Sequence, residues 1–141
     1  MFSRFSEEAQ KALILAKKEM NNLRHPYVGS EHLFLSILSM KDLEITKVLA
    51  SYNIIYEVFK KELIRIVGVG KESNEWFLYT PLLKRVIETA ILNSKEKGEV
   101  EVSVNELLLA ILEEGEGVAI RLLIGLNIDV DEIYNCRRLC S

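Results

Sequence analysis

Glu31 and His32 are the residues whose types and order first suggest chemistry, in the stretch YVGSEHLFLSIL (27–38). A carboxylate beside an imidazole could belong to a zinc site. Adjacent residues of a helix point to different sides, however, and no second histidine follows His32 at four positions. The order Gly29-Ser30 before an apolar run is typical of a helix start. The stretch therefore predicts a helix that begins there, with Glu31 as an exposed acid in its first turn.

A helix start can nevertheless bind a ligand. Its unpaired amides and partial positive charge attract an anion, while Glu31 could pair with a cationic group. Starts of the same kind are expected at Ser6 and, later in the chain, at Thr80 and Ser103. The simpler interpretation is that Glu31 only stabilises the positive end of its own helix. The residues alone leave both interpretations open.

Cys136 and Cys140 are the two cysteines, four positions apart in CRRLC. On a helix this spacing places both on one face, where a disulfide or half of a metal site is conceivable. Two sulfur ligands do not complete a tetrahedral site, and only His25 and His32 could add to them. We interpret them as two reduced, partly buried thiols, which favours a cytoplasmic or similarly reducing compartment. A thiol enzyme that uses Cys140 is a more remote alternative.

Composition and motifs exclude further classes of function. The 141 residues are 49% hydrophobic and 28% charged, as in a globular domain, and the net charge of −3 argues against nucleic-acid binding. No apolar run approaches the roughly 20 residues of a membrane span. GVGK is not a phosphate-binding loop, because Glu72 follows Lys71 where a hydroxyl residue is needed. We expect no nucleic-acid or membrane partner, no catalysis, no metal and no cofactor.

An internal repeat organises the chain at a constant offset of 74 residues. FSEEAQKALILA (5–16) aligns with YTPLLKRVIETA (79–90), and VGSEHLFLSIL (28–38) aligns with VSVNELLLAIL (102–112). Matched apolar positions with drifting surfaces indicate a tandem duplication. We predict repeat 1 over residues 1–67, a linker over 68–78 and repeat 2 over 79–141, together forming one compact domain.

Helical spacing predicts four helices in each repeat and no convincing strand. The first helices begin after Ser6 and Thr80, and the second begin at Gly29-Ser30 and at Ser103, where Glu106 would complete a capping box.

The third and fourth helices of each repeat follow from the same signals. The third helices span about 45–52 and 119–126 and end in Asn-Ile, because asparagine tolerates the left-handed conformation there. The fourth helices span 56–67 and 130–139, the latter opened by Asp129. The fold class predicted is all-α, with about eight helices arranged as two pseudo-twofold four-helix repeats.

The helix starts resemble the N-terminal domain of Clp proteins, most closely that of ClpC-type protein unfoldases. That family carries, twice, a start of the form F/Y-T-x-x-A and a start of the form G-T-E-H followed by apolar residues. Here RFSEEAQKALILA and VGSEHLFLSIL match the first copy. YTPLLKRVIETA and EGEGVAIRLL extend the resemblance over essentially the whole chain.

The resemblance implies a function as well as a fold. The family's N domain is not itself an ATPase and sits ahead of two ATP-driven ring modules. It docks adaptor proteins of the MecA or ClpS kind and receives protein substrates, which are unfolded and handed to a ClpP-type protease. This chain would accordingly be a cytoplasmic, non-catalytic docking domain without a cofactor, monomeric in isolation.

In ClpC-type members each copy also holds a phosphoarginine pocket. The glutamate of G-T-E-H binds the guanidinium, and the hydroxyl residue and amides at the first helix start lie beside the phosphate. Carried over to this sequence, the first pocket maps onto Ser6, Gly29, Ser30 and Glu31.

The second pocket departs from the family pattern. It retains Thr80, but the family's glycine, threonine and glutamate are replaced by Ser103, Val104 and Asn105. Because Asn105 brings no charge to a guanidinium, this pocket is predicted to be degenerate.

A second interpretation, which assigns the chain to another class of protein, also stays open. It holds that the chain is a free-standing, truncated Clp-N regulatory protein that competes with the unfoldase for adaptors. It predicts a stop codon after Ser141 and no ATPase downstream, so the reading frame of the gene distinguishes the two.

Overall fold

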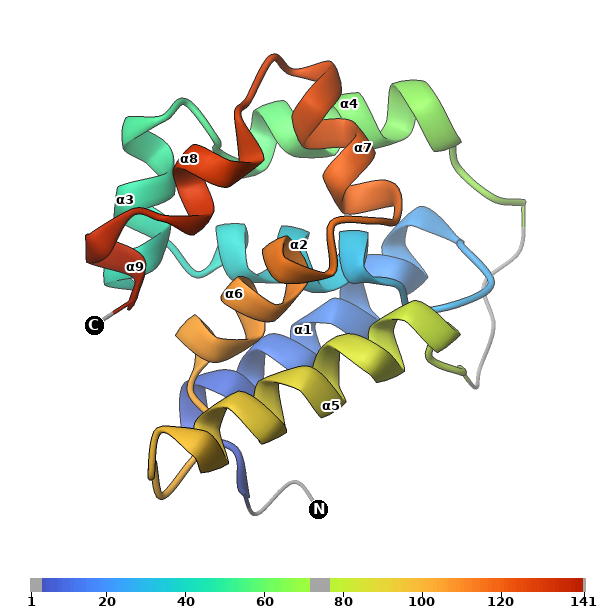
Figure 1. Ribbon diagram of the computed structural model, residues 1–141. Helices are drawn as coiled ribbons and strands as arrows, with labels where there is room; N and C mark the ends of the chain where they lie inside the picture. The colour runs from blue at the N-terminus through green and yellow to red at the C-terminus, as the bar shows by residue number, and fades with distance from the viewer. Residues whose placement is uncertain (1–3, 72–76, 141) are drawn as a thin grey trace.

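The computed structural model describes residues 4–71 and 77–140, leaving aside the side chain of Cys140. Part of the predicted linker, residues 72–76, lies outside these ranges. Within them the chain forms nine helices and no strand, which confirms the all-α prediction (Figure 1). The helices are α1 (Glu7–Leu23), α2 (Ser30–Ser39), α3 (Glu44–Ser51), α4 (Tyr56–Val67), α5 (Pro81–Glu96), α6 (Val104–Glu114), α7 (Val118–Gly125), α8 (Val130–Tyr134) and α9 (Arg137–Cys140).

The helix starts repeat with the offset of 74 found in the sequence. The residues that precede the first helical turns form four pairs at this offset: Ser6 and Thr80, Gly29 and Ser103, Leu43 and Gly117, Ile55 and Asp129. The Ser6 hydroxyl accepts the Ala9 N–H at 3.1 Å, and the Thr80 hydroxyl accepts the Leu83 N–H at 3.1 Å, so both predicted N-caps are confirmed.

The ends of the third helices also match in detail. Asn53 and Asn127 both have φ of 64°, the left-handed conformation predicted for them. The following isoleucines donate their N–H groups back into the last turn, Ile54 to Leu49 and Ile128 to Leu123, each at 3.0 Å. These bonds satisfy carbonyl groups that the helix end would otherwise leave unpaired.

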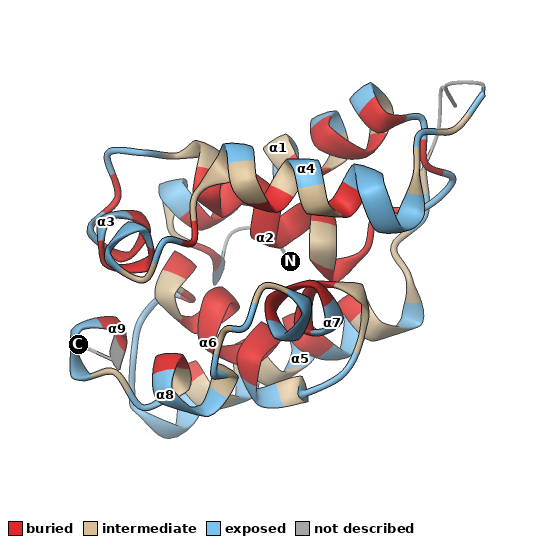
Figure 2. Cartoon of the chain, turned by 90° about the horizontal axis from the view of Figure 1, so that it is seen from above, coloured by how far each residue is buried: buried red, intermediate tan, exposed pale blue. Residues whose placement is uncertain are grey.

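α2 and α6 form the centre of the core, because both are buried over most of their length (Figure 2). A helix that is apolar on nearly all sides is expected to be buried. α1 packs antiparallel on α2, and α5 packs antiparallel on α6 (Figure 1). On the other side of α2 lies α4, where the Phe34 and Phe59 rings are 4.7 Å apart between centroids. In the described ranges, no helix combines the length and the apolar character that crossing a membrane demands.

The fourth helix of repeat 2 is shorter than predicted. We expected it to span 130–139, but α8 ends at Tyr134 and α9 begins at Arg137. The Asn135 backbone N–H makes a regular helical bond to the Asp131 carbonyl oxygen at 3.0 Å, and its side-chain amide competes for the same oxygen at 2.9 Å where the helix ends. In repeat 1 the matching residue is Lys61, a good helix former, and α4 continues without a break.

The break also changes the interpretation of the cysteines. Cys136 lies between α8 and α9 and is a partly buried, free thiol. A hydrogen bond with Cys136 raises the pKa of Tyr52, with burial as a smaller cause. The side chain of Cys140 lies outside what the structure describes. The premise that both cysteines lie on one continuous helix is therefore wrong.

Candidate functional site

Two short backbone pairings join the repeats, and they decide which helix starts meet. The Thr80 N–H donates to the Val28 carbonyl oxygen at 2.9 Å, and the Val28 N–H donates to the Leu78 carbonyl oxygen at 2.9 Å. The start of α5 is thereby fixed beside the start of α2, on the right of Figure 1.

The pseudo-twofold counterpart of this pairing lies at the other end of the molecule. The Ser6 N–H donates to the Val102 carbonyl oxygen at 2.9 Å, and the Val102 N–H donates to the Arg4 carbonyl oxygen at 2.7 Å. This pairing fixes the start of α1 beside the start of α6, on the left of Figure 1. Each pair of starts therefore contains one helix from each repeat.

The pairing of Ser6 with Glu31 within one repeat is consequently wrong. In the antiparallel pair α1 and α2, the Ser36 hydroxyl donates to the Ala12 carbonyl oxygen at 2.7 Å and sets the register. Counting outward from that bond, at ~1.5 Å per residue, Ser6 and Glu31 are about 16 Å apart along the helix axes. Thr80 is the hydroxyl residue that the fold brings to the α2 start.

A third helix start joins α2 and α5 at this place. Gly117 precedes α7 with φ of 97°, a conformation that favours glycine. A Cβ atom at Gly117 would collide with Leu82 in the first turn of α5 and would lie 3.3 Å from the Ser30 Oγ. The starts of α2, α5 and α7 therefore converge, and we call this place the three-helix site. Three sets of N-terminal amides make it a favourable environment for an anion.

Ser30 places an unpaired hydroxyl in the three-helix site. The residue is 1% exposed, and its Oγ has no hydrogen-bond partner among the described residues. A buried hydroxyl without a partner costs about 1–3 kcal/mol. A ligand with an acceptor oxygen would satisfy it.

Glu31 is less exposed than predicted. Its side chain is 14% exposed and folds back over Gly29, where a Cβ atom would collide with the carboxylate. Burial raises the pKa of Glu31, and this effect exceeds the opposing ones of a backbone hydrogen bond at Glu31, of His25 and of Arg121. The carboxylate is thus a partly desolvated acceptor, which favours a charged donor as its partner.

A chain of hydrogen bonds through two histidines holds the α2 start in place. The Gly29 N–H donates to His32 Nδ1 at 2.9 Å, and His32 Nε2 lies 2.8 Å from His25 Nδ1. His25 Nε2 in turn lies 2.7 Å from the Gly68 carbonyl oxygen at the end of α4. The chain is complete when both rings are neutral and each carries its proton on Nε2.

His32 is a structural residue in this arrangement. Burial lowers its pKa to about 3, with a smaller contribution from His25. Its Nδ1 lies 4.0 Å from Glu31 Oε2, but the pair is not a salt bridge because the ring is neutral and accepts the Gly29 N–H. Both histidines thus use their ring nitrogens on each other and on the backbone. Within residues 4–71 and 77–140, no three potential ligands among His, Cys, Asp and Glu come together as a metal site.

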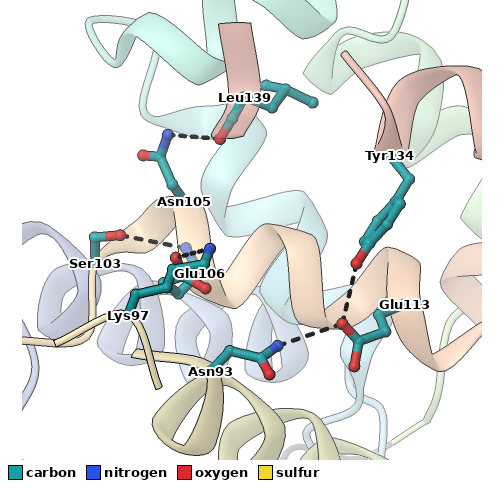
Figure 3. Close-up of polar contacts among 8 residues, drawn as sticks. All are labelled: Asn93, Lys97, Ser103, Asn105, Glu106, Glu113, Tyr134 and Leu139. Carbon is teal, nitrogen blue, oxygen red and sulfur yellow. Dashed lines mark hydrogen bonds and ion pairs between the residues drawn. The ribbon is translucent and has the colours of Figure 1, made fainter. Parts of the chain in front are cut away.

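The start of α6, in repeat 2, carries a different set of contacts (Figure 3). The Ser103 hydroxyl accepts the Glu106 N–H at 3.3 Å, as predicted for an N-cap. The Glu106 carboxylate does not complete the capping box, because it pairs with Lys97 Nζ at 2.7 Å. The Asn105 side-chain amide donates to the Leu139 carbonyl oxygen at 3.1 Å. At the position equivalent to Glu31, this end therefore carries the neutral amide of Asn105 in place of a charged acceptor.

Comparisons with known proteins agree with this architecture. The model of the Clp repeat (R) N-terminal domain matches residues 4–126. The chain is 35% identical over 132 residues to the negative regulator of genetic competence ClpC/MecB of Bacillus subtilis, covering 94% of this chain and 16% of the relative. The chain thus spans about a sixth of the length of the curated relatives it matches.

Solved structures share the fold at lower identity. The N-terminal domain of ClpD from Arabidopsis thaliana has a TM-score of 0.80 at 19% identity, covering 95% of this chain and 92% of that one. The ClpV N-domain in complex with a VipB peptide has a TM-score of 0.71 at 20% identity, covering 99% and 89%. Because the family model matches most of this chain, the chain belongs to the family of Clp repeat N-terminal domains.

Proposed function

We propose that this chain is the docking domain of an ATP-dependent Clp unfoldase and has no catalytic activity or cofactor of its own. Family membership supports the proposal. The B. subtilis relative supports it too, because the chain corresponds to only about a sixth of that protein's length. A ClpV N-domain, which shares the fold, has been solved with a peptide of VipB. In this proposal the domain receives adaptors of the MecA or ClpS kind and protein substrates, which the parent protein unfolds for a ClpP-type protease.

The ligand that the three-helix site fits best is a phosphorylated arginine side chain. The observation that carries this proposal is the convergence of the α2, α5 and α7 starts around the unpaired Ser30 hydroxyl and the Glu31 carboxylate. The amides and hydroxyl would bind the phosphate, and Glu31 would bind the guanidinium.

Two further residues support this division of roles. The Thr80 hydroxyl accepts the Leu83 N–H and keeps its own proton for donation to a phosphate oxygen. Arg121, on α7, is exposed and close enough to Glu31 to lower its pKa, so it adds positive charge to the three-helix site, which favours an anionic group.

The experiment that tests the proposal is calorimetric titration of free phosphoarginine into the wild-type chain, Glu31→Gln and Glu44→Gln. Glu44 is a matched control, since it is also a first-turn acid but is exposed at the start of α3. We expect one equivalent to bind the wild type and Glu44→Gln, and binding to Glu31→Gln to be at least tenfold weaker. Arginine and inorganic phosphate, titrated separately, should bind more weakly than phosphoarginine. Equal binding to Glu31→Gln, or no binding to the wild type, would overturn the phosphoarginine assignment.

A further inference from the structure

α9 covers the start of α6. It packs against both α3 and α6, on the left of Figure 1. Leu139 is fully buried, whereas the two preceding residues, Arg137 and Arg138, are exposed. The Leu139 carbonyl oxygen accepts the Asn105 side-chain amide at 3.1 Å (Figure 3).

The place that α9 covers is the pseudo-twofold counterpart of the three-helix site. The offset of 74 carries the starts of α2, α5 and α7 onto those of α6, α1 and α3. It also carries Glu31 onto Asn105, each the second residue of its helix. The covered position thus corresponds to the part of the three-helix site that Glu31 occupies.

Asparagine in place of glutamate at this position adds a hydrogen-bond donor and removes the charge. An ionised carboxylate only accepts hydrogen bonds, whereas the Asn side-chain nitrogen donates them. The Asn105 side-chain amide donates to a main-chain carbonyl group. Every peptide has such groups, so this bond alone does not select one peptide over another. Specificity must then come from the apolar side chain that enters beside it, here that of Leu139.

The segment that leads into α9 also lies beside α3. Cys136 lies close enough to Tyr52, at the end of α3, to raise the pKa of the tyrosine. The Leu139 N–H donates to the Cys136 carbonyl oxygen at 3.1 Å, which closes the short helical turn. The covering segment is therefore a compact turn of helix that contacts α3 and is bound at Asn105.

We propose that the α6 start is a peptide-binding site of repeat 2, which takes a short helical segment bearing a leucine, and that α9 of the same chain occupies it. The Asn105 side-chain amide donates to a main-chain carbonyl group of the segment, and the pocket beside it takes the leucine side chain. The site does not bind phosphoarginine. This inference goes beyond the proposed function and does not depend on what the three-helix site binds.

Hydrogen exchange on the full chain tests whether Asn105 holds α9. We expect Asn105→Ala to raise the amide exchange rates of residues 137–140 at least tenfold. Asn93→Ala is the matched control, since it also removes a side-chain amide that donates to a neighbour, here Glu113. Unchanged exchange of α9 in Asn105→Ala, or an equal rise in both variants, would overturn the proposal.

Binding in trans tests whether the site recognises a peptide. The probe is a fluorescent peptide of residues 135–141 with both cysteines replaced by serine, and the host is the full chain with Leu139→Asp, which ejects α9. We expect saturable one-to-one binding, at least tenfold tighter than to the wild type, whose own α9 competes. Adding Asn105→Ala to the host should weaken binding tenfold. A helical Leu139→Asp host that binds no peptide would overturn the proposal, and an unfolded host leaves the decision to the exchange experiment above.

Discussion

The Thr80 N–H and the Val28 carbonyl oxygen, 2.9 Å apart, join the first helix of repeat 2 to the second helix of repeat 1. The same bond, carried through the pseudo-twofold relation, joins Ser6 to Val102 at 2.9 Å. Neither repeat can therefore complete a site by itself, since each site draws its helix starts from both. In this fold the two repeats therefore share both the core and the candidate sites.

Thr80 and Ser6 offer a matched pair of substitutions for testing this cross-repeat arrangement. Each hydroxyl caps its helix at 3.1 Å, so Thr80→Ala and Ser6→Ala should each lower the free energy of unfolding by about 0.5–2 kcal/mol. Only Thr80→Ala should also weaken phosphoarginine binding, by at least tenfold, because only Thr80 lies beside Glu31. Denaturant unfolding and calorimetry measure the two effects. Equal losses of affinity in both variants would contradict the arrangement.

Ser30 and Ser36, two buried serines of α2, should respond to substitution in opposite ways. The Ser36 hydroxyl bonds with the carbonyl oxygens of Ala12 and Leu33, at 2.7 and 2.8 Å, and Ser36→Ala should lower the free energy of unfolding by about 1 kcal/mol. The Ser30 hydroxyl has no partner in the described ranges, so Ser30→Ala should leave stability unchanged or raise it.

Phosphoarginine binding should show the reverse order for these two serines. Ser30→Ala removes a donor from the three-helix site and should weaken binding, whereas Ser36→Ala should not. Thermal unfolding and calorimetry on the same protein samples measure both quantities. A Ser30→Ala variant that is clearly less stable than the wild type would show that the hydroxyl has a structural partner.

The sequence predicted well what depends on neighbours along the chain. The caps at Ser6 and Thr80, and the left-handed Asn53 and Asn127, follow from residue types at fixed spacing, and all four are found where expected. The break before α9 had such a signal as well, because Asn135 is a poor helix former whose side chain can bond to the backbone of the preceding turn. Good apolar periodicity on both sides obscured it.

What the sequence did not predict depends on how the helices pack. Ser6 lies far from Glu31 because α1 and α2 are antiparallel, a fact that no local motif records. The surroundings of Glu31 include Gly29, over which its carboxylate lies, and the charge of Arg121 on α7, which is 90 residues away along the chain. The bond between His25 and His32 joins residues on either side of a turn and needed the fold to reveal it.

His32 should make the stability of the domain depend on pH. Its pKa is about 3 in the folded chain against 6.5 in its ordinary state, so the unfolded chain binds the extra proton first as pH falls. The contribution of His32 to stability is complete above pH 6.5. It should be lost progressively below that pH, by up to about 1.4 kcal/mol per pH unit, until pH reaches about 3.

Substituting His32 separates this effect from the titration of carboxylates. Urea unfolding at several pH values should be measured for the wild type and for His32→Asn, whose amide cannot titrate. The stability difference between the two should be constant above pH 7 and should shrink as pH falls from 6.5 to 4.5. A difference that stays constant over this range would mean that His32 is not buried as a neutral ring.

Glu31 should control the pH dependence of ligand binding. Burial raises its pKa above the ordinary value of 4.5, and only the ionised form can pair with a guanidinium. Phosphoarginine affinity should therefore fall as pH drops through the pKa of Glu31. Because Arg121 lowers that pKa, Arg121→Gln should move the loss of affinity to higher pH.

Arg85→Gln is the control for the Arg121 experiment, since Arg85 pairs with Glu114 at 3.2 Å and is exposed. Carbon-detected NMR titration of the Glu31 carboxyl group gives the pKa directly, and calorimetry at matched pH values gives the affinity. The two midpoints should coincide in the wild type and shift together in Arg121→Gln, with no shift in Arg85→Gln. If affinity fell at a pH unrelated to the Glu31 titration, the guanidinium would have to bind elsewhere and the three-helix site would need another ligand.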